Sequence, residues 1–74
     1  MAVEGLCVLS VALEREDDGR WIAEVPDLPG VLAYGATREE AVAKVQALSL
    51  RVLNDRIEHG EAIPEVASRF LVAP

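Results

Sequence analysis

Apolar and polar residues alternate along the first half of the chain with the period of two that is typical of β-strands. The pattern predicts three strands, at residues 6–14, 20–25 and 31–34. The first is apolar at nearly every position, as expected for a central strand covered on both faces. The second has alternating apolar residues, which indicates one buried face. A polar turn that ends in Gly19 separates these two strands and predicts a tight hairpin.

From Thr37 onward the apolar residues recur with the period of a helix. Thr37 and Glu40 form a capping box, in which Thr37 caps the helix and Glu40 reaches back to the Thr37 amide. The helix is expected to run to about Glu58, with Gly60 as a left-handed terminator. His59, the only histidine, is expected to cap carbonyl groups at the helix end.

A last strand is predicted at residues 68–73, which makes the element order βββαβ. A meander leaves the first and third strands parallel, and right-handed crossover then favours the fourth strand beside the first. We therefore expect an α+β two-layer sandwich with the sheet order 3-2-1-4. At 74 residues, the chain is expected to be a single domain over residues 1–74.

The predicted helix carries more apolar surface than packing on one sheet requires. Its larger apolar residues extend over about half of the circumference. They are Ala41, Val42, Val45, Leu48, Leu50, Val52, Leu53 and Ile57. Because one helix covers only one face of a sheet, further apolar residues are candidates for exposure. This surplus predicts a homodimer or a higher homo-oligomer; the alternative is a helix buried more deeply by the C-terminal tail.

The formal net charge of −6 argues against direct nucleic acid binding, because phosphate groups require a basic face. It suits a basic protein partner, although solubility alone also explains it. The lone Cys7 cannot form an internal disulfide and is interpreted as a small core residue. No leader and no membrane-length apolar run is visible, so we expect a cytoplasmic protein without membrane contact.

The sequence shows no set of residues suited to catalysis. Phosphodiester cleavage with two metal ions needs several carboxylates that converge. The first strand has no acidic residue before Glu14, and the last strand has none. Asp55 and Glu58 lie at the far end of the helix without a visible partner. We therefore expect no enzyme, no catalytic residue, no metal site and no cofactor.

Residues 26–30 have the composition of a rigid turn. Pro26 and Pro29 lack amide donors and have a fixed φ, which excludes an interior strand. Gly30 can adopt a positive φ. The simplest interpretation is a turn that joins two antiparallel strands; the alternative is a turn that also lies near a partner, with Asp27 and Leu28 within it.

Residues 21–40, W-I-A-E-V-P-D-L-P-G-V-L-A-Y-G-A-T-R-E-E, resemble the HicB-like antitoxin family, specifically its N-terminal domain. The family signature is A-E-V-P-D-L-P-G followed by G-x-T-x-E-E-A. The likeness extends backward through residues 16–21 and forward through residues 60–64. It implies a partial ribonuclease-H-like fold and a binding role: neutralisation of a small, basic HicA ribonuclease toxin by occlusion of its active site.

The resemblance fixes no toxin-binding residues, so the candidates come from their positions beside the turn and the helix start. They are Trp21, Asp27, Leu28 and Glu39. Full-length members commonly add a C-terminal DNA-binding domain, and we expect none in this chain. The alternative function is an orphan oligomeric domain that binds another protein or a small ligand, without a toxin partner.

Overall fold

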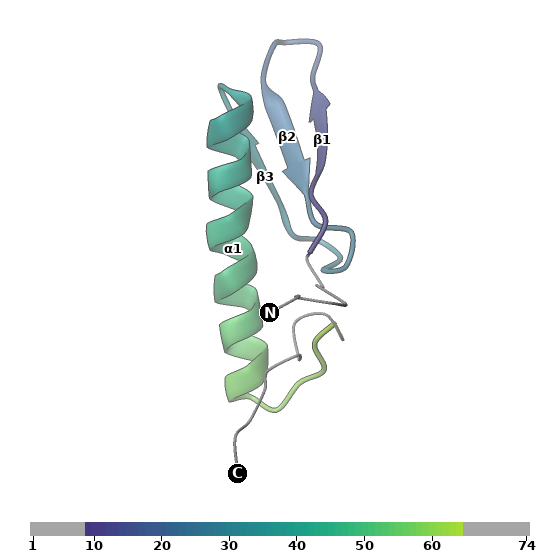
Figure 1. Ribbon diagram of the computed structural model, residues 1–74, viewed down its shortest axis with the longest axis vertical. Helices are drawn as coiled ribbons and strands as arrows, with labels where there is room; N and C mark the ends of the chain where they lie inside the picture. Colours follow the sequence, from purple (N-terminus) through teal and green to yellow (C-terminus); the bar gives the residue numbers. More distant parts are fainter. Residues whose placement is uncertain (1–8, 65–74) are drawn as a thin grey trace, which may run out of the picture.

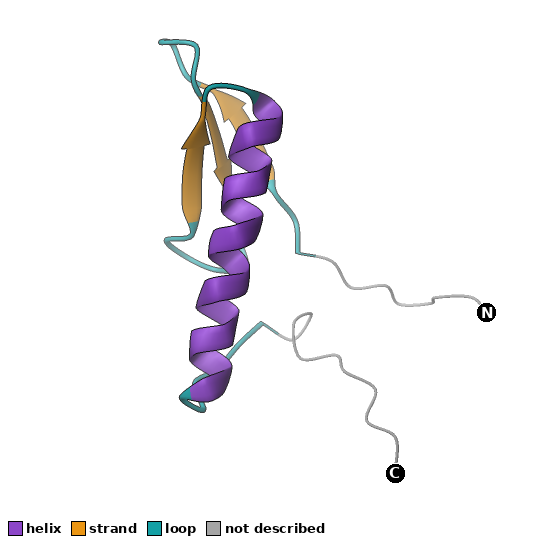
Figure 2. Ribbon diagram, turned by 90° about the vertical axis from the view of Figure 1, so that its left-hand side faces the viewer, coloured by secondary structure: helices purple, strands orange, loops and turns teal. Residues whose placement is uncertain are grey.

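The computed structural model describes residues 9–64 of the chain. Three strands and one long helix follow one another in the order β1, β2, β3 and α1 (Figure 1). Their bounds are Ala12–Arg15, Trp21–Glu24, Leu32–Gly35 and Arg38–Glu58. The strands form one antiparallel sheet, and α1 lies along one of its faces (Figure 2). The α+β class predicted from the sequence is confirmed.

The strand order β1-β2-β3 agrees with the first three positions of the predicted order 3-2-1-4. The fourth strand, expected at residues 68–73, lies outside the described residues. Its place beside the first strand therefore stays a prediction. The same holds for the partial ribonuclease-H-like fold, which includes that strand.

The apolar pattern predicts a first strand at residues 6–14, of which residues 6–8 lie outside the described residues; within the described part the strand begins only at Ala12. β1 begins at Ala12, which pairs with Glu24, the last residue of β2. Beyond this pair the chain after β2 turns away at Pro26, which has no amide hydrogen to donate to a neighbouring strand. Residues 9–11 therefore extend past the end of the strand that would pair with them.

The turn between β1 and β2 is a tight hairpin, as predicted. The Gly19 amide donates to the Glu16 carbonyl at 2.9 Å, and the Glu16 amide donates to the Arg20 carbonyl at 2.7 Å. Gly19 has a φ of +90°, in the left-handed region. This is a three-residue loop with a glycine at its last position, which matches the twist of the flanking strands.

The connection between β2 and β3 consists of two successive turns. The Leu28 amide donates to the Val25 carbonyl at 2.9 Å, and the Val31 amide donates to the Leu28 carbonyl at 3.0 Å. A third bond, from the Val25 amide to the Val31 carbonyl at 3.0 Å, closes the pair. Pro29 and Gly30 are the central residues of the second turn, and Gly30 has a φ of +87°. The predicted rigid turn is therefore confirmed.

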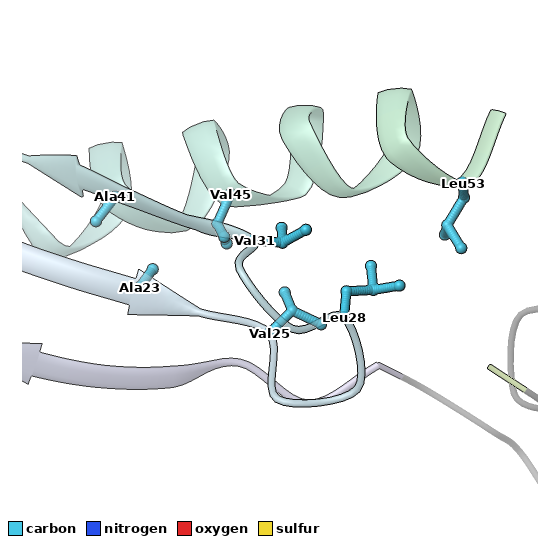
Figure 3. Close-up of a cluster of buried hydrophobic side chains, with 7 residues drawn as sticks. All are labelled: Ala23, Val25, Leu28, Val31, Ala41, Val45 and Leu53. Atoms are coloured by element: carbon cyan, nitrogen blue, oxygen red, sulfur yellow. The ribbon is translucent and has the colours of Figure 1, made fainter. Parts of the chain in front are cut away.

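The hydrophobic core lies between α1, the sheet and this double turn (Figure 3). Its buried residues are Ala23, Val25, Leu28, Val31, Ala41, Val45 and Leu53. Three of the seven come from the double turn, because its three hydrogen bonds direct their side chains inward while the prolines stay exposed. Complete burial of one leucine stabilises a fold by roughly 1.5–3 kcal/mol, so the turn is also a structural anchor.

The buried face of α1 differs in part from the predicted one. Residues at every fourth position are buried: Ala41, Val45, Ser49 and Leu53. Leu53 was expected on the surplus surface but belongs to the core, whereas Leu48 and Val52 are only half-buried beside it. Ser49 is accommodated because its hydroxyl donates to the Val45 carbonyl at 2.7 Å.

The helix begins as predicted in one respect and differs in another. Thr37 Oγ1 accepts a hydrogen bond from the Glu40 amide at 3.1 Å, which confirms Thr37 as the N-cap. The Glu40 carboxylate does not take the predicted position on the Thr37 amide. It pairs instead with Lys44 Nζ at 2.9 Å. The hydrogen bond from Lys44, its charge, and then the Ala36 amide lower the pKa of Glu40.

The helix ends in a hydrogen-bonded motif around Gly60. The Gly60 amide donates to the Ile57 carbonyl at 3.2 Å, and the Glu61 amide donates to the Arg56 carbonyl at 2.8 Å. Gly60 has a φ of +67°, so the chain reverses here in the left-handed conformation. These two bonds are those of a Schellman motif. The predicted glycine terminator is confirmed.

Candidate partner-binding surface

The four residues predicted to contact a partner do not lie together. Trp21 is the first residue of β2 and pairs with Gly35, just before α1. Glu39 is in the first turn of α1 and lies at the same end of the molecule (Figure 1). Asp27 is in the double turn, at the opposite end of β2. The candidates therefore form two separate groups.

Leu28 is not a surface residue. Its side chain is fully buried and lies between α1 and the double turn (Figure 3). The prediction that Leu28 contacts a partner is wrong for this structure, because the two successive turns direct the side chain into the core. Asp27, its neighbour, is exposed.

We call the upper part of the molecule in Figure 1 the hairpin end; it consists of residues 16–21, Tyr34 and residues 38–40. Close packing of α1 on β3 holds it together. Gly35 is buried, and a Cβ atom at this position would lie 2.4 Å from the Ala41 backbone nitrogen. Only glycine allows the start of the helix to approach β3 this closely. The first turn of α1 is therefore fixed beside Trp21, the partner of Gly35.

Arg20 organises the side chains of the hairpin end. Its Nε atom donates to Asp18 Oδ2 at 2.8 Å, and its amide donates to Asp18 Oδ1 at 3.0 Å. The guanidinium also lies over the ring of Tyr34, 4.7 Å from the ring centroid, within the range of a cation–π interaction. The Arg20 amide, followed by the Arg20 side chain, lowers the pKa of Asp18. A charged side chain is thus held in a fixed position on an exposed surface.

A shallow hollow of about 350 Å³ lies beside this arrangement. Its lining residues are Glu16, Asp17, Asp18, Arg20 and Tyr34. Within residues 9–64, ion pairs occupy the carboxylates of Asp18 and Glu40 but not those of Glu16, Asp17 or Glu39. The hollow therefore offers the free acidic groups of Glu16 and Asp17 beside the aromatic ring of Tyr34, a combination that suits a basic protein surface.

The outer face of the sheet, which α1 does not cover, extends from the hairpin end to the double turn. In the register of the sheet, Ile22 is opposite Tyr34, and Glu24 is opposite Leu32. Tyr34 and Leu32 point away from α1 and are exposed, whereas Ala33 between them is half-buried. The sequence analysis did not single out these two β3 residues. Their alternation with Ala33 and Gly35 is the signal that would have indicated them.

A second concave surface is apolar and lies between the start of the described chain and α1. This groove of about 440 Å³ is lined by Leu9, Val11, Val25, Val45, Gln46, Ser49 and Leu50. Leu50 is 68% exposed, and Ile57, seven residues further along α1, is 52% exposed. The predicted surplus of apolar helix surface therefore exists at Leu50 and Ile57.

The side chains of the hairpin end are suited to binding a partner. The carboxylates accept hydrogen bonds, the aromatic rings offer flat apolar contacts, and Arg20 is already paired with Asp18.

The prediction that Asp55 has no visible partner is wrong. Its carboxylate lies 3.3 Å from His59 Nδ1. Among residues 9–64, no helix is long and apolar enough to cross a membrane.

Comparison with known proteins gives two matches. Residues 9–70 match the model of a family described as the HicB-like antitoxin of bacterial toxin–antitoxin systems. The chain is also similar to the UPF0150 protein Ta0767 of Thermoplasma acidophilum, with 29% identity over 55 residues. That alignment covers 74% of this chain and 80% of the relative. No solved structure matches the chain.

Proposed function

Because the chain belongs to the HicB-like antitoxin family, we propose that it binds a small HicA-type ribonuclease toxin and occludes the toxin's active site. The observation that carries the proposal is the family match over residues 9–70, which includes every element of the described fold. An antitoxin of this kind acts by binding, so no catalytic group is required of it. We extend the proposal accordingly: the chain is not an enzyme and does not bind nucleic acid directly.

The hairpin end is the surface that we assign to the toxin. On the outer face of the sheet it presents Tyr34 beside the free carboxylates of Glu16 and Asp17. Trp21, half-buried against the core, points to the face that carries α1, whose first turn includes the exposed Glu39. Aromatic side chains contribute strongly to protein interfaces, and acidic groups accelerate encounter with a basic partner. A toxin that also contacted Asp27 would have to lie across the outer face of the sheet, over Leu32. We keep Trp21, Glu39 and Asp27 as proposed contacts of the toxin, with Trp21 and Glu39 at the hairpin end and Asp27 at the double turn.

Self-association is the second part of the proposal. Leu50 and Ile57 are seven residues apart on α1, which places them on the same exposed side of the helix. Exposed apolar side chains of this size are usually covered in the functional assembly when they cluster. We propose that this side of α1 forms a contact between copies of the chain, in a homodimer or a higher oligomer.

The apolar groove beside Leu9 and Leu50 supports the alternative function. An apolar groove of several hundred Å³ has the size of a small-molecule site. On this reading the chain is an oligomeric domain that binds a small ligand or another protein and has no toxin partner. The two functions differ in which surface is used: the hairpin end for a toxin, and the groove for a ligand.

The test is inhibition of ribonuclease activity by the purified chain. The reading frames beside the gene of this chain are searched for a short basic protein with one central histidine. That protein is purified, and its cleavage of RNA is measured with increasing amounts of the chain. Antitoxin function predicts that activity disappears near equimolar amounts, and that the chain alone cleaves neither RNA nor DNA with Mg²⁺ or Mn²⁺. Unimpaired cleavage at a large excess of the chain would contradict the proposal.

A further inference from the structure

Three side chains with metal-binding groups lie together at the C-terminal end of α1, far from the hairpin end. Asp55, His59 and Glu61 each offer one ligand atom, and these atoms lie within 4.8 Å of one another. All three side chains are exposed, so an ion could reach them from solvent. The set combines an imidazole with two carboxylates, a donor set suited to divalent transition metals.

The backbone brings these residues together in two ways. Asp55 and His59 are four residues apart, one turn of helix, so their side chains lie on the same side. Glu61 is beyond the end of the helix and returns to it because Gly60 reverses the chain. The bond from the Glu61 amide to the Arg56 carbonyl, at 2.8 Å, fixes that return. The position of Glu61 thus results from the Schellman motif and not from helical periodicity.

One of the distances within the group matches that between two ligands of a small ion, and the third ligand atom lies within 4.8 Å of both. Ligand atoms about 2.1 Å from a tetrahedral Zn²⁺ are about 3.4 Å apart. His59 Nδ1 and Asp55 Oδ1 are 3.3 Å apart, which already matches this separation. Nδ1 also lies 2.7 Å from the Asp55 carbonyl oxygen. An ion bound at Nδ1 would displace the proton of that hydrogen bond, and the imidazole would turn away from the carbonyl oxygen, because 2.7 Å is too short to hold an ion about 2.1 Å from each atom on the line between them.

The electrostatics of this helix end favour a cation. The C-terminal end of a helix carries a partial negative charge because its last carbonyl groups have no partner within the helix. Residues 55–61 contain three carboxylates, at Asp55, Glu58 and Glu61, against the single guanidinium of Arg56. A divalent ion would reduce the repulsion among these groups.

We propose that Asp55, His59 and Glu61 form a surface site for a divalent transition metal ion such as Zn²⁺, with water completing its coordination. The site is separate from the proposed toxin surface and does not depend on that function. Its effect would be to tie the chain after Gly60 to the end of α1. Ile63 follows two residues later and packs against the core, so a bound ion would stabilise the exit of the chain from the helix.

His59 gives a direct probe because it is the only histidine in the chain. Tag-free protein is titrated with ZnCl2, and the imidazole signals of His59 are followed by NMR. We expect saturable shifts with one ion per chain, largest at Nδ1, and a rise in Tm. MgCl2 and CaCl2 at the same concentrations should leave the signals unchanged, because these ions prefer oxygen donors alone. Similar shifts with Zn²⁺, Mg²⁺ and Ca²⁺ would indicate nonspecific binding of cations to the carboxylates and would overturn the proposal.

Two substitutions separate the site from general acidity. Glu61→Gln should weaken zinc binding at His59 by at least about tenfold, as loss of a group that supports a metal site typically does. Glu58→Gln removes the same charge at a neighbouring exposed position outside the group and should change binding little. Equal losses in the two variants, or His59 signals that do not respond to zinc in the unchanged protein, would contradict the site.

Discussion

Gly35 determines how closely α1 approaches the sheet. A Cβ atom here would lie 2.4 Å from the Ala41 nitrogen and 2.9 Å from the Ala41 Cα, both backbone atoms that cannot rotate away. Gly35→Ala should therefore displace the start of the helix and lower the free energy of unfolding by about 1–3 kcal/mol, the usual cost of overpacking. Urea unfolding followed by circular dichroism measures the loss. Ala36→Ser, an equally small change at the exposed neighbour, should cost less than about 0.5 kcal/mol.

Gly30 is sensitive for a different reason. Nothing lies within 4 Å of a Cβ built at this position, but its φ of +87° is rarely adopted by residues with side chains. Gly30→Val should be strained by roughly 1–3 kcal/mol and should loosen the double turn. Gly30→Asn should cost less, because asparagine tolerates the left-handed region better than valine does. Thermal unfolding of the two variants compares them; a valine variant as stable as the asparagine variant would mean that backbone conformation does not limit this position.

The sequence predicts single residues well where the controlling interaction is local. Thr37 and Gly60 were identified because caps depend on neighbours within a few positions. Leu28 was assigned to the surface because it lies beside Asp27 in a turn, where side chains are usually exposed. Its burial requires two turns in series, and that arrangement depends on hydrogen bonds between Val25 and Val31. The sequence analysis also missed that Glu61 lies near Asp55, because this proximity depends on the hydrogen bond from the Glu61 amide to the Arg56 carbonyl.

At the scale of elements, the start of α1 depends on pH through Glu40. Lys44 and the Ala36 amide lower the pKa of this carboxyl from its reference value of 4.5. A folded-state pKa below the unfolded value gives stability that is present above about pH 4.5 and is lost as the pH falls through the folded pKa. Lys44→Gln should therefore reduce helix stability at neutral pH and flatten the loss of stability between neutral and acidic pH.

Thermal unfolding as a function of pH measures this effect. Because Glu40 is fully exposed, the effect should be small and should weaken as salt is added. Arg51→Gln is the matched control, since it removes one positive charge further along the helix without removing an ion pair among residues 9–64. If both variants showed the same dependence on pH, net charge rather than the Glu40–Lys44 pair would be responsible.

The elements themselves follow from the periodicity of the sequence, but their lengths do not. The apolar run from residue 6 predicts a longer first strand than β1, because the pattern of one strand contains no information on where its partner ends. β2 ends just before Pro26. Because Ala12 pairs with Glu24, the last residue of β2, β1 cannot begin before Ala12. The same is true of the buried face of α1. The helical periodicity of the sequence predicts that one face is apolar, but the short strands determine which residues of that face are buried.

At the scale of the whole molecule, the 21 residues of α1 extend well beyond strands of four residues each (Figure 1). Leu50 and Ile57 lie on this helix with more than half of their surface exposed. Sedimentation at micromolar concentration should show a mass above 8.0 kDa. The double variant Leu50→Lys, Ile57→Lys should sediment as a smaller species and stay folded. A monomer in the unchanged protein would contradict self-association through α1.

The proposed toxin interface can be tested from both ends of the sheet. Charge reversal at Glu39, in the hairpin end, should weaken binding to a basic toxin and mainly slow association, since exposed charges act on encounter. Asp27→Lys, at the double turn, should weaken binding only if the toxin also lies across the outer face of the sheet. Both residues are exposed, so circular dichroism should show an unchanged fold.

Surface plasmon resonance measures the association and dissociation rate constants of the chain and the toxin at low and at high salt. Glu58→Lys, at the opposite end of α1 from Glu39, is the control for net charge. A loss for Glu39→Lys alone would restrict the toxin to the hairpin end; equal effects of all three variants would remove any assignment of the interface to these residues.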